Sequence, residues 1–169
     1  NHEKIHLVLQ GALASAERSV RIVTPYFVPS ATIVSAMCMA KLRGVEVTLV
    51  LPSKVDLPYM RWAADAFLWQ VLQHGVRVFL RKPPFVHTKL VIVDDQWFLL
   101  GSANIDRRSF RLNFEFNIEV YDEAMAGQLG RWIDTLVEES KEVTLEDVDA
   151  RPKWMRLRDG LVRLFAPYL

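Results

Sequence analysis

Two periods of apolar and polar residues alternate along the chain. A period close to that of an α-helix predicts helices over residues 3–17, 29–42, 57–73 and 123–139. Short apolar runs between turn residues predict strands over residues 19–24, 45–51, 76–81, 87–93 and 97–100, and strict alternation predicts another over 113–122. This order of elements predicts an α/β fold in which helices cover both faces of a mixed central sheet.

The chain is long enough for one domain. Its 169 residues are 51% hydrophobic and can bury one substantial core, which we expect over about residues 1–142. Residues 143–169 are expected to form a polar connection followed by a short C-terminal helical tail. An apolar stripe runs along this tail, made of Trp154, Leu157, Leu161, Leu164 and Phe165, with Lys153, Arg156, Arg158 and Arg163 around it. Such a basic amphipathic segment either docks on its own domain or lies in a membrane interface, and the pattern leaves both open.

Charge and cysteine content narrow the classes of partner. The 21 Lys and Arg residues nearly cancel the 20 Asp and Glu residues, so we expect no nucleic-acid partner. A lone cysteine, Cys38, excludes an internal disulfide and a zinc cluster. No apolar run approaches the roughly 20 residues that cross a bilayer, so we expect the chain as given to be soluble. It begins with Asn1 rather than Met, which suggests a piece of a longer protein.

The stretch "VHTKLVIVDDQWFLLGSAN", residues 86–104, concentrates the candidate chemistry. Side chains alternate along a strand, so His87 and Lys89 are expected to share one surface. A hairpin that turns near Asp94 would return Ser102 and Asn104 to the end where His87 lies. An ammonium, a hydroxyl, an amide and an imidazole together suit an anionic phosphate.

This spacing also resembles a known signature. His87, Lys89, Asp94, the Gly101-Ser102-x-Asn104 run and the later Glu115 resemble the HKD motif of the phospholipase D superfamily. More narrowly, "TPYFVPS", "GSANIDRRSFRLNFEFNIEVYD" and the closing "LVRLFAPYL" are similar to the carboxy-terminal half of bacterial cardiolipin synthases. The resemblance implies a phospholipase D-like α/β/α sandwich and a reaction through a phosphohistidine. It implies neither a cofactor nor a metal.

The resemblance also implies roles for single residues. His87 would be the nucleophile or the general acid, Lys89 and Asn104 would hold the phosphate, and Glu115 would orient His87. Asp94 belongs to the signature, although a hairpin turn explains that residue equally well.

Substrate contacts are less clearly marked in the sequence. Ser102 is either a phosphate contact or the partner of Gly101 in a tight turn, and Arg107 either binds an anionic headgroup or lies in a solvated cationic turn. Tyr26 and Phe27 follow a predicted strand, where they either line the substrate site or pack within the loop.

The superfamily mechanism calls for two signature histidines, and this chain carries one full signature. A second half of the same chain or an identical partner chain would supply the other. We expect half of the site of a phosphatidyltransferase that joins two phosphatidylglycerol molecules and releases glycerol. The parent protein would belong to the bacterial inner membrane, with peripheral membrane contact by this part. The alternatives are a homodimeric phosphodiesterase or nuclease, and a non-catalytic, membrane-contacting half.

Overall fold

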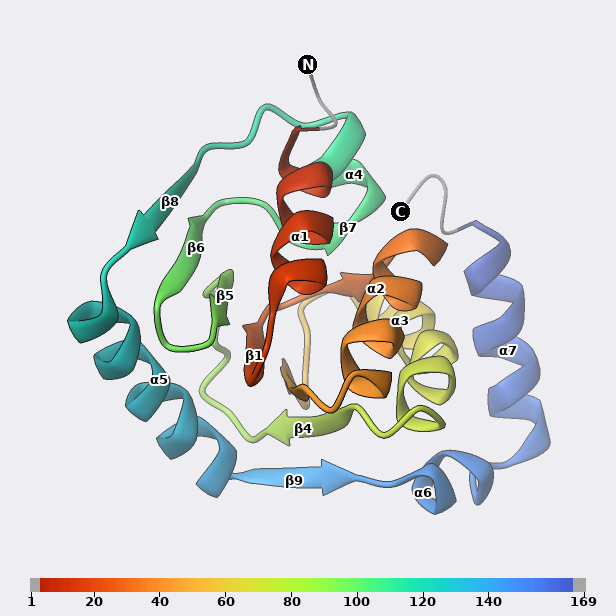
Figure 1. Ribbon diagram of the computed structural model, residues 1–169. Coiled ribbons are helices and arrows are strands. Elements are labelled where there is room, and N and C mark those ends of the chain that lie inside the picture. Colours follow the sequence, from red (N-terminus) through yellow and green to blue (C-terminus); the bar gives the residue numbers. More distant parts are fainter. Residues whose placement is uncertain (1–3, 166–169) are drawn as a thin grey trace.

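A seven-stranded sheet forms the middle layer of the computed structural model, which describes residues 4–165 apart from the side chain of residue 111 (Figure 1). The strands lie in the order β8-β6-β5-β1-β3-β4-β9. Their bounds are β1 (Ser19–Val23), β3 (Glu46–Pro52), β4 (Arg77–Arg81), β5 (Leu90–Val93), β6 (Trp97–Gly101), β8 (Asn117–Tyr121) and β9 (Ser140–Val143). Strands β1, β3 and β4 run parallel, and the other pairings are antiparallel, so the predicted mixed sheet is confirmed.

Helices cover both faces of this sheet, as predicted. Helices α1 (Lys4–Ser15), α2 (Ala31–Leu42) and α3 (Pro58–Leu72) pack on one face, and α5 (Glu123–Glu138) packs on the other. Successive residues of β1 point to opposite faces, so Ile22 joins the core under α1–α3, whereas Val23 joins the core under α5. The domain is therefore a three-layer α/β/α sandwich.

Two predicted strands are shorter than the alternating pattern suggested, for the same reason. Strand β5 begins only at Leu90, because its neighbour β1 ends at Val23, which lies opposite Leu90. Strand β8 begins only at Asn117, because its neighbour β6 ends at Gly101. A residue without a neighbouring strand has no ladder to join. His87 therefore lies in a loop, not in a strand as predicted.

Several short elements were not predicted. Strands β2 (Phe27–Val28) and β7 (Ile105–Asp106) form a small parallel sheet. Helix α4 (Arg107–Arg111) follows β7 and is capped by Asp106, whose carboxylate accepts a hydrogen bond of 2.7 Å from the backbone N–H of Ser109. Strand β9 pairs with β4, and α6 (Leu145–Asp149) lies in the stretch expected to be a polar connection.

The C-terminal segment contains helix α7 (Lys153–Leu164), which packs against α3 on the side of the molecule remote from β8 (Figure 1). The expected ends of the first helix at Glu3 and of the tail at Leu169 lie outside the described residues. No helix within residues 4–165 has the length and apolar character needed to span a bilayer.

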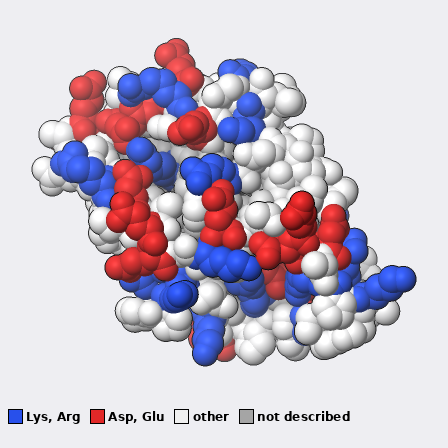
Figure 2. Space-filling model, turned by 90° about the horizontal axis from the view of Figure 1, so that it is seen from below, with Lys and Arg blue, Asp and Glu red and all other residues white. Residues whose placement is uncertain are grey.

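Acidic and basic side chains are interleaved on the face that Figure 2 shows, which is the underside of the molecule in Figure 1. Two ion pairs illustrate the pattern: Arg77 with Glu142 and Lys141 with Asp147, each at 2.9 Å. This face carries no continuous basic surface.

Candidate active site

The loops that follow three parallel strands meet at the carboxyl ends of these strands. Tyr26 follows β1, Asp56 follows β3 and His87 follows β4. The carboxyl ends of parallel strands lie side by side, which is where α/β proteins commonly place ligands. The hydroxyl of Tyr26 donates a hydrogen bond to the carboxylate of Asp56. Burial, together with this carboxylate, raises the pKa of Tyr26 far above its usual value, so its phenol stays protonated.

Two aromatic rings flank the imidazole of His87. The ring of Tyr26 meets it edge-on with 6.4 Å between centroids, and the ring of Phe85 lies at 5.6 Å. The two contacts restrict the orientation of the imidazole while its residue stays exposed to solvent. Tyr26 thus lies at the candidate site, where the sequence allowed a substrate wall.

The ammonium of Lys89 contacts His87 directly. Its Nζ lies 3.0 Å from Nδ1 and 3.1 Å from Nε2 of the imidazole, and it donates to the His87 carbonyl oxygen at 2.8 Å. An ammonium can only donate, so the imidazole nitrogen that accepts from it must carry a lone pair. Partial burial and the charge of Lys89 lower the pKa of His87, and the more distant Asp56 carboxylate opposes them. The neutral imidazole, which is the nucleophilic form, is therefore favoured at neutral pH.

Lys89 is an unusually buried cation. Only 8% of the residue is exposed, and this desolvation lowers the pKa of Lys89. The carboxylates of Glu115 and Asp106 act in the opposite direction and favour the charged ammonium. A charge held in such surroundings attracts an anion more strongly than the same charge in water.

Glu115 and Ser102 form a pair beside this ammonium. The Ser102 hydroxyl donates to the Glu115 carboxylate and accepts from the backbone N–H of Phe116 at 2.9 Å. Glu115 also accepts from the amide of Asn113 at 3.2 Å. We predicted that Glu115 would orient His87, but its hydrogen bonds go to Ser102 and Asn113. Glu115 lies just before β8, which pairs with β6, so it lies beside Ser102 at the end of β6.

Gly101 allows this arrangement. A Cβ atom at this position would lie 2.3 Å from the carbonyl oxygen of Phe116 and 2.6 Å from Cα of Asn117. Only glycine permits so close an approach of two backbones.

Asn104 joins the same cluster through Asp106. Its side-chain amide hydrogen-bonds to Asp106, and its backbone N–H donates to the Ser109 hydroxyl at 3.0 Å. The Asn104 Oδ1 is buried and has no hydrogen-bond partner among the described residues. Burial raises the pKa of Asp106, which is 3% exposed, and hydrogen bonds from the backbone N–H and hydroxyl of Ser109 and from Asn104 oppose that effect. Lys89, Asn104, Ser102 and Glu115 are thus brought together, as the hairpin predicted.

Asp94 is not brought to this cluster. It lies in the turn between β5 and β6, at the opposite end of the hairpin from Lys89. Its carboxylate accepts hydrogen bonds from the backbone N–H groups of Glu17, Arg18 and Ser19, at 2.9, 2.8 and 2.7 Å. These contacts match the turn role that the sequence also allowed, and a catalytic role for Asp94 stays a prediction.

Two predicted substrate contacts also need comment. Phe27 is fully buried in β2 within the core under α1–α3, so it is a packing residue and does not line the site. Arg107 opens α4 directly after Asp106 and is half-buried. Within the described part of the chain its guanidinium makes no ion pair, and no contact links it to His87 or Lys89.

The structure adds Asp56, Phe85 and Asp106, which sequence reasoning missed. Asp106 follows Asn104 by two residues and caps α4, so its position was the one available signal. Asp56 reaches Tyr26 across 30 residues of sequence, and no local pattern marks that contact. Within residues 4–165, no three His, Cys, Asp or Glu side chains are grouped so as to hold a metal ion.

Solved structures share this fold. The phospholipase D family member Nuc from Salmonella typhimurium superposes with a TM-score of 0.73 at 21% identity, over 82% of this chain and 90% of that one. Phosphatidylserine synthase from Haemophilus influenzae superposes with a TM-score of 0.77 at 17% identity, over 98% of this chain and 44% of that one. At such identities the likeness shows the fold alone.

Sequence relatives are more specific. Cardiolipin synthase 1 of Staphylococcus epidermidis is 39% identical over 157 residues, which make up 93% of this chain and 32% of that protein. Major cardiolipin synthase ClsA of Bacillus subtilis is 38% identical over 160 residues, or 93% of this chain and 33% of that protein. The chain thus spans about one third of the length of these relatives. The family described as "Cardiolipin synthase, PLD-like domain" matches residues 9–137. The chain therefore belongs to the family of phospholipase D-like domains of cardiolipin synthases.

Proposed function

We propose that this chain supplies one half of the active site of a phosphatidyltransferase that makes cardiolipin from two phosphatidylglycerol molecules. One observation carries the proposal: a buried ammonium, Lys89, contacts the imidazole of His87 at the carboxyl ends of the parallel strands. The amide of Asn104 and the Ser102–Glu115 pair lie beside it. This combination neutralises a phosphodiester and offers it a nucleophile.

In the first step, a nitrogen of the His87 imidazole attacks the phosphorus of one phosphatidylglycerol. A bond forms between nitrogen and phosphorus, the bond from phosphorus to the glycerol oxygen breaks, and the departing oxygen takes a proton from the second signature histidine. Lys89 compensates the negative charge on the phosphoryl oxygens. In the second step, the hydroxyl of another phosphatidylglycerol gives its proton to that second histidine and attacks the phosphorus. Cardiolipin leaves, His87 is regenerated, and the net products are cardiolipin and glycerol. The reverse assignment, with His87 as the general acid, uses the same contacts.

The second half is expected to bind beside this site. Four large apolar residues of the segment before and within β8 are exposed: Leu112 at 65%, Phe114 at 97%, Phe116 at 76% and Ile118 at 42%. They border the site, because the backbone of Phe116 hydrogen-bonds to Ser102. Exposed apolar groups in one strip mark a protein interface more often than a free surface. An edge strand such as β8 also needs cover. A second signature half on this strip would bring its histidine toward His87.

The test uses the full-length protein that contains this chain and its second half, assayed with phosphatidylglycerol by mass spectrometry for cardiolipin, glycerol and phosphatidic acid. His87→Ala should reduce transfer by a factor on the order of a thousand or more, because the nucleophile or the general acid is lost. His74→Ala is the matched control, since among the described residues that imidazole hydrogen-bonds to the carbonyl oxygen of Gln70 on α3, at 2.9 Å, and lies apart from the cluster around Lys89. Unchanged turnover in His87→Ala would refute the proposal and favour a non-catalytic half.

A second candidate is a homodimeric phosphodiesterase. The specific observation is that Nuc, a phospholipase D family member, is matched over 90% of its own length by a domain of this size. Two copies of this chain, joined through the same strip, would supply two signatures. Phosphatidic acid as the product, without cardiolipin, would favour this candidate. The near-zero net charge argues against a nucleic-acid substrate.

A further inference from the structure

Helix α7 is attached to the domain through charged side chains and through Val162, which packs against the core under α1–α3. The guanidinium of Arg158 lies 4.3 Å from the ring centre of Trp62, and that of Arg163 lies 5.1 Å from the ring centre of Phe67, both on α3. Asp159 is 2% exposed and forms ion pairs of 2.7 Å with Arg158 and with Arg151. Buried paired charges and cation–π contacts therefore hold this helix in one orientation.

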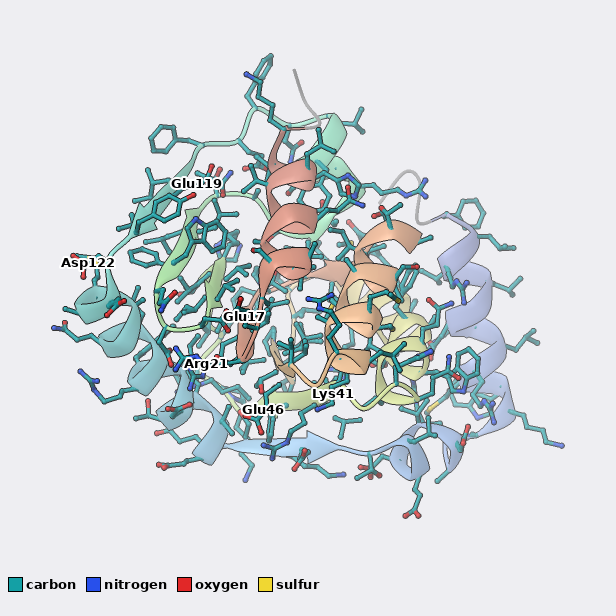
Figure 3. All side chains as sticks on the ribbon, viewed as in Figure 1. Glu17, Arg21, Lys41, Glu46, Glu119 and Asp122 are labelled. Atoms are coloured by element: carbon teal, nitrogen blue, oxygen red, sulfur yellow. The ribbon has the colours of Figure 1, made fainter. Side chains whose placement is uncertain are left out.

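The apolar side of α7 faces outward as a result. The apolar stripe predicted from the sequence stays exposed: Trp154 at 61%, Leu157 at 66%, Leu161 at 53%, Leu164 at 71% and Phe165 at 61%. A surface helix ordinarily buries its apolar stripe and exposes its charges. Here the arrangement is reversed, and no described element covers the stripe. Figure 3 shows side chains projecting from the outer side of α7 with nothing packed beyond them.

Positive charge borders this stripe. Helix α7 contains four cations and one anion, Asp159, which is buried and paired, so its own charge is +3 (4 − 1). Lys153 and Arg156 are exposed and lie next to the stripe on the helical surface, because successive residues turn by about 100°. Arg156 also forms an exposed ion pair of 3.6 Å with Asp149, which a lipid phosphate would have to replace. A tryptophan begins the helix, as is common where a helix meets a lipid headgroup region.

We propose that α7 lies flat on an anionic lipid bilayer, with the apolar stripe inserted at the headgroup boundary and Lys153 and Arg156 on lipid phosphates. The charge selects this occupant: an apolar stripe bordered by cations complements an anionic membrane. The interface for a second half lies elsewhere, since the strip at β8 and α7 are on opposite sides of the molecule (Figure 1). The proposal goes beyond the reaction proposed above, because surface binding requires no turnover.

The test measures sedimentation of the chain with vesicles of phosphatidylcholine, with and without phosphatidylglycerol. We expect binding only to the anionic vesicles and weaker binding as salt increases. The double variant Leu157→Gln, Leu161→Gln should weaken vesicle binding at least about tenfold, because two inserted leucines are lost. Both residues are more than half exposed, so the fold is expected to persist, and circular dichroism checks it.

A control protein keeps the outcome interpretable. Leu7→Gln combined with Leu42→Gln removes two equally exposed leucines, at 61% and 71%, from α1 and α2, and should bind vesicles as the unaltered chain does. The proposal is overturned if the unaltered chain ignores anionic vesicles or if the Leu157/Leu161 variant still binds fully. Loss of association with the second half in the α7 variant, with vesicle binding intact, would identify a protein partner instead and also overturn it.

Discussion

Replacing Asp94 by asparagine tests whether this signature residue acts in folding rather than in chemistry. In the structure, Oδ1 of Asp94 accepts from the backbone N–H groups of Arg18 and Ser19, and Oδ2 accepts from that of Glu17. The carboxylate therefore ties the turn of the hairpin to the connection between α1 and β1. Asparagine has nearly the same shape and also tolerates the left-handed backbone of this residue, whose φ is 55°. The substitution thus removes charge and one acceptor with little other change.

The magnitude follows from these three hydrogen bonds. One asparagine oxygen can keep the bonds to Arg18 and Ser19 without charge assistance, but the amide NH₂ cannot accept from Glu17. A hydrogen bond to a charged group contributes about 1.5–3 kcal/mol, so the loss of one and the weakening of two should cost about 2–4 kcal/mol. For a chain of this size, that corresponds to a fall in Tm of roughly 6–12 °C.

The pH dependence has a definite sign. Burial alone raises the pKa of Asp94, but the three backbone N–H groups outweigh it and hold the pKa below its usual value. The stabilisation is therefore complete above the unfolded pKa of about 3.9 and is lost as the pH falls through the lower folded pKa. The difference between the unaltered chain and Asp94→Asn should shrink on acidification below about pH 4.

Urea unfolding followed by circular dichroism measures this effect, and Asp95→Asn is the matched control. Asp95 is the adjacent residue, shares the φ of 55°, and forms an ion pair with Arg21 in which its side chain is 40% exposed. Exposed ion pairs contribute about 0–1 kcal/mol, so this control should unfold almost as the unaltered chain does. Equal losses of stability in the two variants would refute the reasoning. So would a loss of phosphatidyl transfer in Asp94→Asn with unchanged stability, which would return Asp94 to the chemistry.

Three further changes test the site and its surroundings. Gly101→Ala would place a Cβ 2.3 Å from the Phe116 carbonyl oxygen, so β8 must shift, and urea unfolding should show a loss of ~1–3 kcal/mol; full stability would contradict the close approach. Lys89→Met removes a charge that lowers the pKa of His87, so an NMR titration of the imidazole should give a higher pKa than in the unaltered chain, and an equal or lower value would contradict the contact. Phe27→Ala opens a cavity in the core and should lower the free energy of unfolding by about 3–5 kcal/mol, whereas a residue of the substrate wall would change KM and leave stability intact.

The long elements were predictable because their periods extend over many residues, whereas strand ends were not. The sequence pattern begins before the residues that pair: β5 begins only at Leu90 and β8 only at Asn117, where their neighbours end. The length of a strand depends on its partner, which no local pattern describes. The same limit explains the loop position of His87.

The residues of the candidate site could be predicted where they lie at a fixed spacing in the sequence. Lys89, Ser102, Asn104 and Glu115 come together because the antiparallel strands β5, β6 and β8 bring the start of β5, the end of β6 and the start of β8 to one end. The hydrogen-bond partners within the cluster could not be predicted from the sequence as well. Glu115 bonds Ser102 rather than His87, and the signature also contains Asp94, which serves the fold. Residues of both kinds occur at fixed spacing, so spacing alone cannot separate them.

Helix α7 links the proposed membrane contact to the proposed active site, because it packs on α3. Arg158 packs on Trp62 of α3, and Arg151 pairs with both Asp159 of α7 and Asp65 of α3, so these contacts fix the outward stripe relative to α3. Helix α3 begins at Pro58, two residues after Asp56, whose carboxylate accepts from Tyr26 beside His87. A bilayer that binds the stripe would thereby set the orientation of this loop and of the imidazole next to it. The proposed reaction takes both of its substrates from a membrane, so it would need such a fixed orientation, and the proposed contact of α7 with the bilayer would supply it.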